Sequence, residues 1–198
     1  KIYSLSKVSS LSVVQIKNMT LEPIIEDITS NYSLNPKKAW LYIIPTGHRG
    51  TIDINGTQFC KECLKNENPY IKKQWRLAWN IVCSIHKEFL LCKCQRCNTT
   101  FSQHKINYID THIYKCKNCN FDLRLSNTLP ANNEILLFKE KLNNAAFNNI
   151  IDKTFPLIQY SQSELFLTIR TLIPLLKNLY NLKKYKQLFV KIGFNTTL

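Results

Sequence analysis

Four short clusters of metal-type ligands occupy the middle of the chain. Each cluster places two ligands three positions apart: Cys60 and Cys63, Cys83 and His86, Cys94 and Cys97, and Cys116 and Cys119. Two side chains at this spacing can turn back from one tight loop toward the same ion, and two such loops supply the four ligands of a structural zinc site. The intervals 64–82 and 98–115 have lengths typical of zinc ribbons. The sequence therefore predicts two structural Zn²⁺ ions.

The way in which the four clusters pair is open at the level of sequence. Neighbouring clusters suit two sequential sites, and a cross-braced arrangement, in which the first cluster shares an ion with the third, is also compatible. The eight cysteines form an even number, which permits a disulfide framework instead. Zinc is favoured because no secretory signal is visible and because cysteines three positions apart rarely bond to each other. Cys92 remains outside the pattern and is predicted to be a spare or buried thiol.

A catalytic zinc site is the enzyme alternative. The residues His86-Lys87-Glu88 followed by Cys94 and Cys97 are similar to the ligand pattern of zinc deaminases. The intervening segment 89–93 is too short for the two helices of such a site, and four available protein ligands leave no coordination position open for water. The sequence also holds no glycine-rich phosphate loop and no convincing Ser/His/Asp set. We therefore expect that the protein is not an enzyme.

The composition is strongly basic. Among 198 residues, Lys and Arg number 27 and Asp and Glu number 13, which gives a formal net charge of +14. Seven thiolates and two zinc ions would lower this charge by three, to about +11. Such a charge favours a polyanionic partner, most simply DNA, although a well-solvated surface or a bias toward Lys, Asn and Ile explains it as well.

The same composition bears on the location of the protein. No stretch approaches the ~18–20 apolar residues that span a bilayer, so no membrane partner is expected. Thiols arranged for metal fit a reducing cytoplasm. The chain begins with Lys1 rather than Met, and we expect further residues upstream.

Three regions follow from the change of pattern along the chain. We expect a helical region at 1–46, with a partial helix-turn-helix, a tandem zinc-binding region at 47–127, and further helices at 128–198. The fold class expected is mainly α, with a small zinc-ribbon-like α+β centre.

The N-terminal region carries a helix-start signal. Ser12 and Gln15 fit a capping box, which predicts a helix after a first helix at 2–8 and a turn at 9–11. In a helix-turn-helix this second helix would present Gln15, Lys17 and Asn18 to DNA. Two packing helices without a DNA role are equally compatible.

The first zinc interval contains basic and aromatic residues. If segment 69–79 is helical, Trp75 and Trp79 share one face and pack beside the metal, with nucleobase stacking as the alternative. The basic residues would lie outside. Together with a loop arginine and the N-terminal residues, they complete the predicted nucleic-acid contacts: Gln15, Lys17, Asn18, Arg49, Lys72, Lys73 and Arg76. Gly56 is predicted to lie in a hairpin turn, and segment 89–91 to form a strand.

Helical periodicity returns in the C-terminal region. A helix is predicted at 134–147, with an apolar face built from Ile135, Leu136, Phe138, Leu142 and Phe147. Ser161 and Glu164 open a second helix at 165–180, which Pro174 should kink or divide. The terminal run 177–198 is basic, and is predicted to be a solvated face or a phosphate contact.

Taken together, the central motifs resemble those of the TniQ family, bacterial transposon proteins that choose the insertion target. The resemblance rests on Gln58-Phe59-Cys60-Lys61-Glu62-Cys63, Pro69-Tyr70, Trp75-Arg76-Leu77-Ala78-Trp79, Cys83-Ser84-Ile85-His86, Leu90-Leu91 and Cys94-Gln95-Arg96-Cys97, in the family's order and spacing. Segments 163–166 and 169–172 are similar to its later helices, so that the resemblance extends over about 11–176. The chain departs from the family where Lys61, Ser84 and Gln95 replace knuckle prolines and where the glycine after the histidine is missing.

The resemblance implies a target-selection adaptor for DNA transposition with two zinc ions as scaffold. Such a protein would bind DNA directly or dock on an RNA-guided effector complex, and would recruit the transposition machinery through a regulator ATPase. It would not itself cut or join DNA, and a homodimer is compatible with this role. The rival hypothesis is a zinc module for protein–protein interaction that does not contact DNA.

Overall fold

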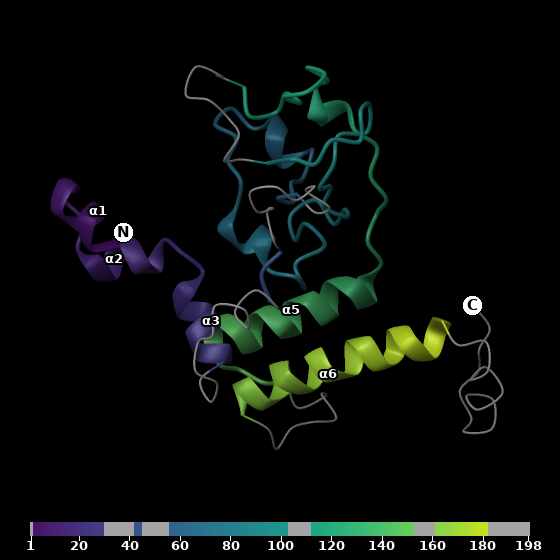
Figure 1. The fold of residues 1–198 in the computed structure, drawn as a ribbon. Helices are drawn as coiled ribbons and strands as arrows, with labels where there is room; N and C mark the ends of the chain where they lie inside the picture. The colour runs from purple at the N-terminus through teal and green to yellow at the C-terminus, as the bar shows by residue number, and fades with distance from the viewer. Residues whose placement is uncertain (1, 30–41, 45–55, 103–111, 153–160, 182–198) are drawn as a thin grey trace. The chain divides into compact units, whose positions relative to one another are not determined.

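A computed structural model describes residues 2–29, 42–44, 56–102, 112–152 and 161–181 of the protein (Figure 1). The chain separates into two compact units, Lys1–Ile150 and Ile151–Leu198. The described residues are mainly helical and contain isolated β-bridges rather than longer strands. The expected fold class is confirmed in this coarse form, whereas the division into three regions stays a prediction.

Three short helices form the N-terminal part of the first unit. They are α1 (Ile2–Val8), α2 (Val13–Asn18) and α3 (Glu22–Ile28). The predicted capping box is present, because the Ser12 hydroxyl accepts from the Gln15 N–H at 3.2 Å and the Gln15 side chain accepts from the Ser12 N–H at 2.8 Å. Helix α3 contributes three buried isoleucines, Ile24, Ile25 and Ile28. The chain therefore has the two helices of the expected motif, while a DNA-reading role for them stays a prediction.

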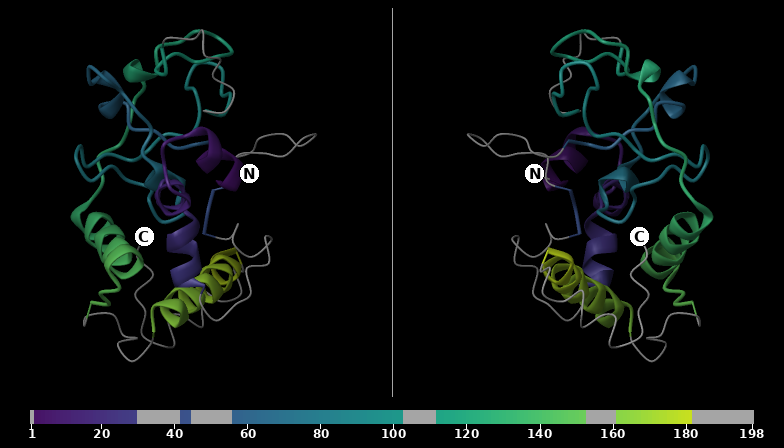
Figure 2. Two further views of the ribbon diagram at one scale, coloured as in Figure 1. Left: turned by 90° about the vertical axis from the view of Figure 1, so that its left-hand side faces the viewer. Right: turned by 90° about the vertical axis from the view of Figure 1, so that its right-hand side faces the viewer.

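The cysteine-rich part of the first unit is built from tight turns and extended segments (Figure 2). Its helical elements are single 3₁₀ turns: η1 (Cys63–Lys65), η2 (Lys73–Arg76) and η4 (Leu123–Leu125). Antiparallel bridges hold the extended segments together, among them Phe59 with Leu91 and Val82 with Phe89. The strand predicted at 89–91 is thus present as two isolated bridges, which suits a region whose shape is set by ligand-bearing turns.

Segment 69–79, between the first two clusters, does not form the helix on which a shared face of Trp75 and Trp79 depended. Only the turn η2 forms there, and the backbone is extended again at Leu77. Trp75 and Trp79 consequently do not share a helix face. Trp75 is buried in the core, whereas Trp79 lies edge-on to Tyr42 and donates through Nε1 to the Asn143 side chain at 2.9 Å. The four-residue spacing of the two tryptophans does not indicate a helix here, because tertiary packing, and not helix propensity, determines where their rings lie.

One apolar core underlies both halves of the cysteine-rich part. Phe59 and Phe101 contact each other with ring centroids 5.0 Å apart, and Leu64, Trp75 and Leu123 complete the cluster around them. Each such side chain contributes roughly 1.5–3 kcal/mol when it is withdrawn from water. Because the core contains residues from both intervals between clusters, the two ligand sets are supported by the same packing.

Helix α5 (Asn133–Asn148) ends the first unit and confirms the helix predicted at 134–147. The Asn132 side chain caps its start by accepting from the Ile135 N–H at 2.9 Å. Its buried face was predicted wrongly in part. The residues that are buried are Lys139, Leu142, Ala145 and Ala146, whereas Phe138 is 49 % exposed. Apart from Leu142, which was predicted, small residues and one lysine stem form this face, so a search for large apolar residues misses most of it.

Helix α6 (Gln162–Asn181) belongs to the second unit. The Ser161 hydroxyl and the Glu164 carboxylate form a capping box at its start, at the residues that were predicted to open the helix. The helix continues past Pro174 to Asn181, so it is not divided there. The basic run at 182–198 lies outside the described residues. Within the part of the chain that the structure describes, every helix is too short or too polar to cross a bilayer.

Candidate metal centres

Three of the four ligand clusters share one backbone structure. They are the turns that carry Cys83 and His86, Cys94 and Cys97, and Cys116 and Cys119. In each, the N–H of the first ligand donates to a carbonyl of the returning chain, at Glu88, Thr99 and Phe121, over 2.8–2.9 Å. The residue after the second ligand donates back to the carbonyl of the first, over 2.8–2.9 Å. Each of these three turns is therefore closed by two main-chain hydrogen bonds.

The residue after the second ligand of these turns has a left-handed backbone. Lys87, Asn98 and Asn120 have φ angles of 53°, 56° and 56°. Glycine and asparagine adopt this conformation more easily than other residues, so the two asparagines suit their positions and Lys87 is strained. The asparagines following Cys97 and Cys119 are a sequence signal for these turns that the spacing argument did not use.

The Cys60 and Cys63 cluster is built differently. After Cys63 the chain enters the 3₁₀ turn η1, and the Leu64 N–H donates to the Cys60 carbonyl at 3.2 Å. Leu64 is fully buried in the core beside its two cysteines. Apolar packing fixes this turn, in place of the paired main-chain bonds of the other three.

The first ligand set consists of Cys60, Cys63, Cys83 and His86, whose ligand atoms all lie within 4.8 Å of one another. His86 Nδ1 is 3.4 Å from the sulfurs of Cys60 and Cys63, and the sulfurs of Cys63 and Cys83 are 3.8 Å apart. A tetrahedral zinc ion would separate two sulfurs by about 3.8 Å, and a sulfur and a nitrogen by about 3.5 Å. The donor set and its spacing therefore fit zinc, whereas a disulfide would need about 2.05 Å.

The second ligand set consists of Cys94, Cys97, Cys116 and Cys119, again within 4.8 Å of one another. The sulfur separations are 3.6 Å for Cys94 with Cys119 and 3.6 Å for Cys97 with Cys116. Cys97 and Cys119 are only half-buried, in contrast to the three buried cysteines of the first set. Both sets pair neighbouring clusters, so the sequential arrangement is the correct one and the cross-braced alternative is excluded. Cys92 is half-buried and belongs to neither set, as predicted.

The ionisation of the thiols shows why each set suits a cation. A hydrogen bond with Cys60 lowers the pKa of Cys83 to about 4, and the same bond together with burial raises the pKa of Cys60. In the second set, hydrogen bonding with Thr99 lowers the pKa of Cys97 to about 5, whereas burial raises the pKa of Cys116 to about 12. Crowded thiols cannot all ionise against one another. A divalent cation removes this conflict, because it favours the thiolate form of every ligand at once.

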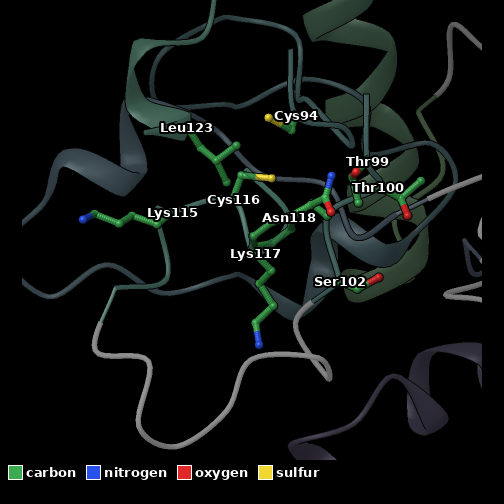
Figure 3. A pocket seen from close by; sticks show the side chains of 10 residues that line it. Cys94, Thr99, Thr100, Ser102, Lys115, Cys116, Lys117, Asn118 and Leu123 are labelled. Carbon is green, nitrogen blue, oxygen red and sulfur yellow. The ribbon is translucent and has the colours of Figure 1, made fainter. Parts of the chain in front are cut away.

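A cavity of about 220 Å³ lies beside the second set, with Cys94 and Cys116 on its wall (Figure 3). The ammonium ends of Lys115 and Lys117 point away from Cys116, toward the outside. The Ser102 hydroxyl is buried and has no hydrogen-bond partner among the described residues.

The residues predicted to contact nucleic acid are mostly engaged within the protein. Gln15 closes the capping box, and Lys17 lies 3.5 Å from the Glu26 carboxylate. Lys73 donates to the carbonyls of Asn18 and Thr20 at 2.5 and 3.3 Å, so η2 and the end of α2 are brought together. DNA contact by these residues stays a prediction.

The remaining three of these residues are Lys72, Arg76 and Arg49. The Lys72 ammonium lies 5.8 Å from the centre of the Trp75 ring. The Arg76 guanidinium donates to the Ile44 carbonyl at 3.2 Å, and burial lowers its pKa. Arg49 lies outside the described residues. DNA contact at these positions also stays a prediction.

Sequence reasoning missed the contacts between α5 and the first ligand set. Lys139 is 6 % exposed, and its ammonium donates to the Ser84 hydroxyl inside the turn that carries Cys83 and His86. Burial lowers the pKa of Lys139, while the charge of Cys83 acts in the opposite direction. Four positions further along the helix, Asn143 bonds to Trp79 and to Asn80. Neither residue stands out in the sequence, because a lysine and an asparagine within a helix are ordinarily solvated.

Fold and ligand geometry together define a small, mainly helical protein with two tetrahedral Cys/His clusters. Comparison with protein families adds that residues 2–90 match the TniQ family. This match runs from α1 through the first ligand set, and it supports the resemblance to the TniQ family seen in the sequence. The match begins before residue 11 and ends at residue 90, so the second ligand set and the later helices lie outside it. Comparison with curated proteins finds no match.

Proposed function

We propose that the protein is a zinc-stabilised adaptor that selects the target site in DNA transposition. The observation that carries this proposal is a complete Cys₃His set inside the segment that matches the TniQ family. The family match supports a role in transposition, and the ligand geometry supports zinc as the cofactor. The proposed ligands of the two Zn²⁺ ions are Cys60, Cys63, Cys83 and His86 in the first centre, and Cys94, Cys97, Cys116 and Cys119 in the second.

In this proposal the metal ions are structural. Each set already offers four protein ligands, so a bound zinc ion keeps no position for water or substrate. The core around the centres is small, and zinc binding of order 10–16 kcal/mol per site would supply much of the folding free energy. The protein itself therefore has no catalytic step, and it works in a reducing compartment such as the cytoplasm.

The partners follow from family and charge. The protein binds DNA, a target-recognition complex such as an RNA-guided effector, or both, and it recruits a transposition regulator ATPase. The net charge of +14 favours contact with phosphate backbones.

A second candidate function is a protein–protein adaptor that does not touch DNA. It is favoured by the internal engagement of Lys17, Lys73 and Arg76, whose charged groups already have partners within the protein. In this case the positive charge serves solubility or a contact with an acidic protein surface.

Two measurements test the proposal. Elemental analysis of protein purified under reducing conditions should find two zinc ions per chain, and a chain that is natively folded without metal contradicts the cofactor assignment. DNA binding should weaken steeply as salt rises, because each neutralised phosphate releases counterions. Capture of the regulator ATPase without any DNA affinity at low salt supports the protein–protein adaptor instead.

A further inference from the structure

The buried lysine of α5 lacks an acidic partner within the described residues. Lys139 is 6 % exposed, yet the ion pairs formed by the described residues do not include it. Its hydrogen-bond acceptor there is the neutral hydroxyl of Ser84. An ammonium group withdrawn from water is costly unless a negative charge lies close to it. We therefore expect a negatively charged group close to the Lys139 ammonium.

The first ligand set provides that anion. Three thiolates, a neutral imidazole and one divalent zinc ion leave one net negative charge in a buried place. Ser84, which accepts from Lys139, directly follows the ligand Cys83 in the same turn. The other charged groups that act on Lys139 are Lys72, which repels it, and its exposed neighbour Glu140, whose attraction is the weakest contribution.

We propose that Lys139 is the counter-charge of the first metal centre and that it couples zinc occupancy to the docking of α5. This inference rests on the proposed zinc binding. Lys139 acts as a positioning residue: its ammonium balances the charge of the thiolate centre and orients Ser84 beside Cys83. The same positive charge makes the Cys83 sulfur less reactive toward electrophiles. Zinc in turn would hold the three cysteines in their thiolate form, and the net negative charge of the loaded centre would keep the ammonium buried.

The contacts around Lys139 show how one charge can hold a whole helix. On the same face, Asn143 accepts from Trp79 at 2.9 Å and donates to Asn80 at 3.2 Å. Just before the helix, the Ala131 N–H donates to the Lys87 carbonyl at 2.8 Å. All these partners belong to the segment that leads into, or closes, the Cys83 and His86 turn. Loss of the ion would therefore disturb the hydrogen bonds that join α5 to this segment.

The experiment compares K139M with K139R and with K115M. K139M removes the charge and keeps the length of the side chain, K139R restores the charge, and K115M removes an exposed lysine beside the second centre as a matched control. For each variant we would measure zinc content, zinc affinity in competition with a chromophoric chelator, and the rate at which N-ethylmaleimide alkylates Cys83, followed by peptide mass spectrometry.

We expect K139M to lose about 10-fold or more in zinc affinity at one site and to be alkylated faster at Cys83. K139R should recover most of both properties, and K115M should resemble the wild type. Unchanged affinity and alkylation in K139M, with two zinc ions bound, overturn the inference while leaving the proposed cofactor intact. A wild-type chain without zinc overturns the proposed cofactor itself.

Hydrogen exchange of the wild-type protein covers the case in which K139M does not fold. Partial removal of zinc by a chelator should release the amide protection of α5 together with that of segment 83–88. In C116S, where only the second centre is damaged, α5 should stay protected. If α5 keeps its protection after the first centre has lost zinc, the coupling is absent and the inference is wrong.

Discussion

The two ligand sets have nearly the same geometry but different surroundings. The first combines a 3₁₀ turn, whose Leu64 is buried in the core, with one hydrogen-bonded turn, and its three cysteines are buried. The second is built from two hydrogen-bonded turns, and Cys97 and Cys119 are half-buried. The first also receives a lysine from α5 and lies within the family segment. The comparison shows that four ligands of the same type can form a metal site buried in the apolar core or a partly exposed site that joins two turns.

Loss of one ligand should separate the two centres most clearly. We expect C60S to lose zinc at the first centre and to unfold the first unit, since roughly 10–16 kcal/mol of metal-linked folding energy depends on that site. C116S should lose one zinc ion and keep α5 and the first centre folded. Zinc analysis and circular dichroism melting of both variants check this. Equal unfolding of the two variants would show that the centres are not separable.

Gly56 offers a way to break the packing between the two centres. A Cβ at this position would lie 2.5 Å from the carbonyl oxygens of Cys92 and Phe101, which are backbone atoms that cannot rotate away. We expect G56A to cost about 3 kcal/mol, at the upper end of overpacking effects. The midpoint of urea unfolding measures this cost. A variant as stable as the wild type would contradict the close approach of these chain segments.

The strained lysine of the first centre provides a smaller effect in the opposite direction. Lys87 has a φ of 53°, where Asn98 and Asn120 stand in the equivalent turns of the second centre. We expect K87G to stabilise the protein by about 1 kcal/mol, because glycine removes the strain of the left-handed conformation. N98G is the matched control and should change stability far less. Thermal melting of the two zinc-loaded variants tests the difference between them.

The smallest effect is expected at the surface of the second centre. The Arg124 guanidinium, 2.6 Å from the Asp122 carboxylate, holds the pKa of that carboxyl below its usual range. The ionised form is therefore favoured in the folded state. Its contribution is complete above the unfolded pKa of about 3.9, and it is lost as pH falls through the folded value.

D122N should thus destabilise the protein by at most about 1 kcal/mol, because the pair is partly exposed. The difference from the wild type should be the same at pH 6 and at pH 8, since Asp122 is ionised at both. Urea unfolding at the two pH values measures it. A difference that changes between them would mean that another group titrates with this pair.

The ligand sets were predictable because metal chemistry fixes residue type and spacing directly. The capping boxes at Ser12 and Ser161 were also predictable, since each depends on residues close together in sequence. The segment with Trp75 and Trp79 was not, because distant partners decide its backbone: Gln58 donates to the Trp75 carbonyl at 2.8 Å and to the Asn80 carbonyl at 3.0 Å. Lys139 was missed for the same reason. Its burial depends on a charge that lies 55 positions away in sequence, at the Ser84 turn.

The close packing of the chain around Gly56 has a consequence for the design of shorter fragments of the protein. The Thr57 N–H donates to the Phe101 carbonyl at 2.7 Å, and the Phe59 N–H donates to the Leu91 carbonyl at 2.7 Å. A fragment cut at the end of the family segment, residue 90, would keep all four ligands of the first centre and lose both of these neighbours. A count of the ligands alone would not reveal this loss, because the family match ends between extended segments that are hydrogen-bonded to each other. The excised piece should therefore not fold by itself.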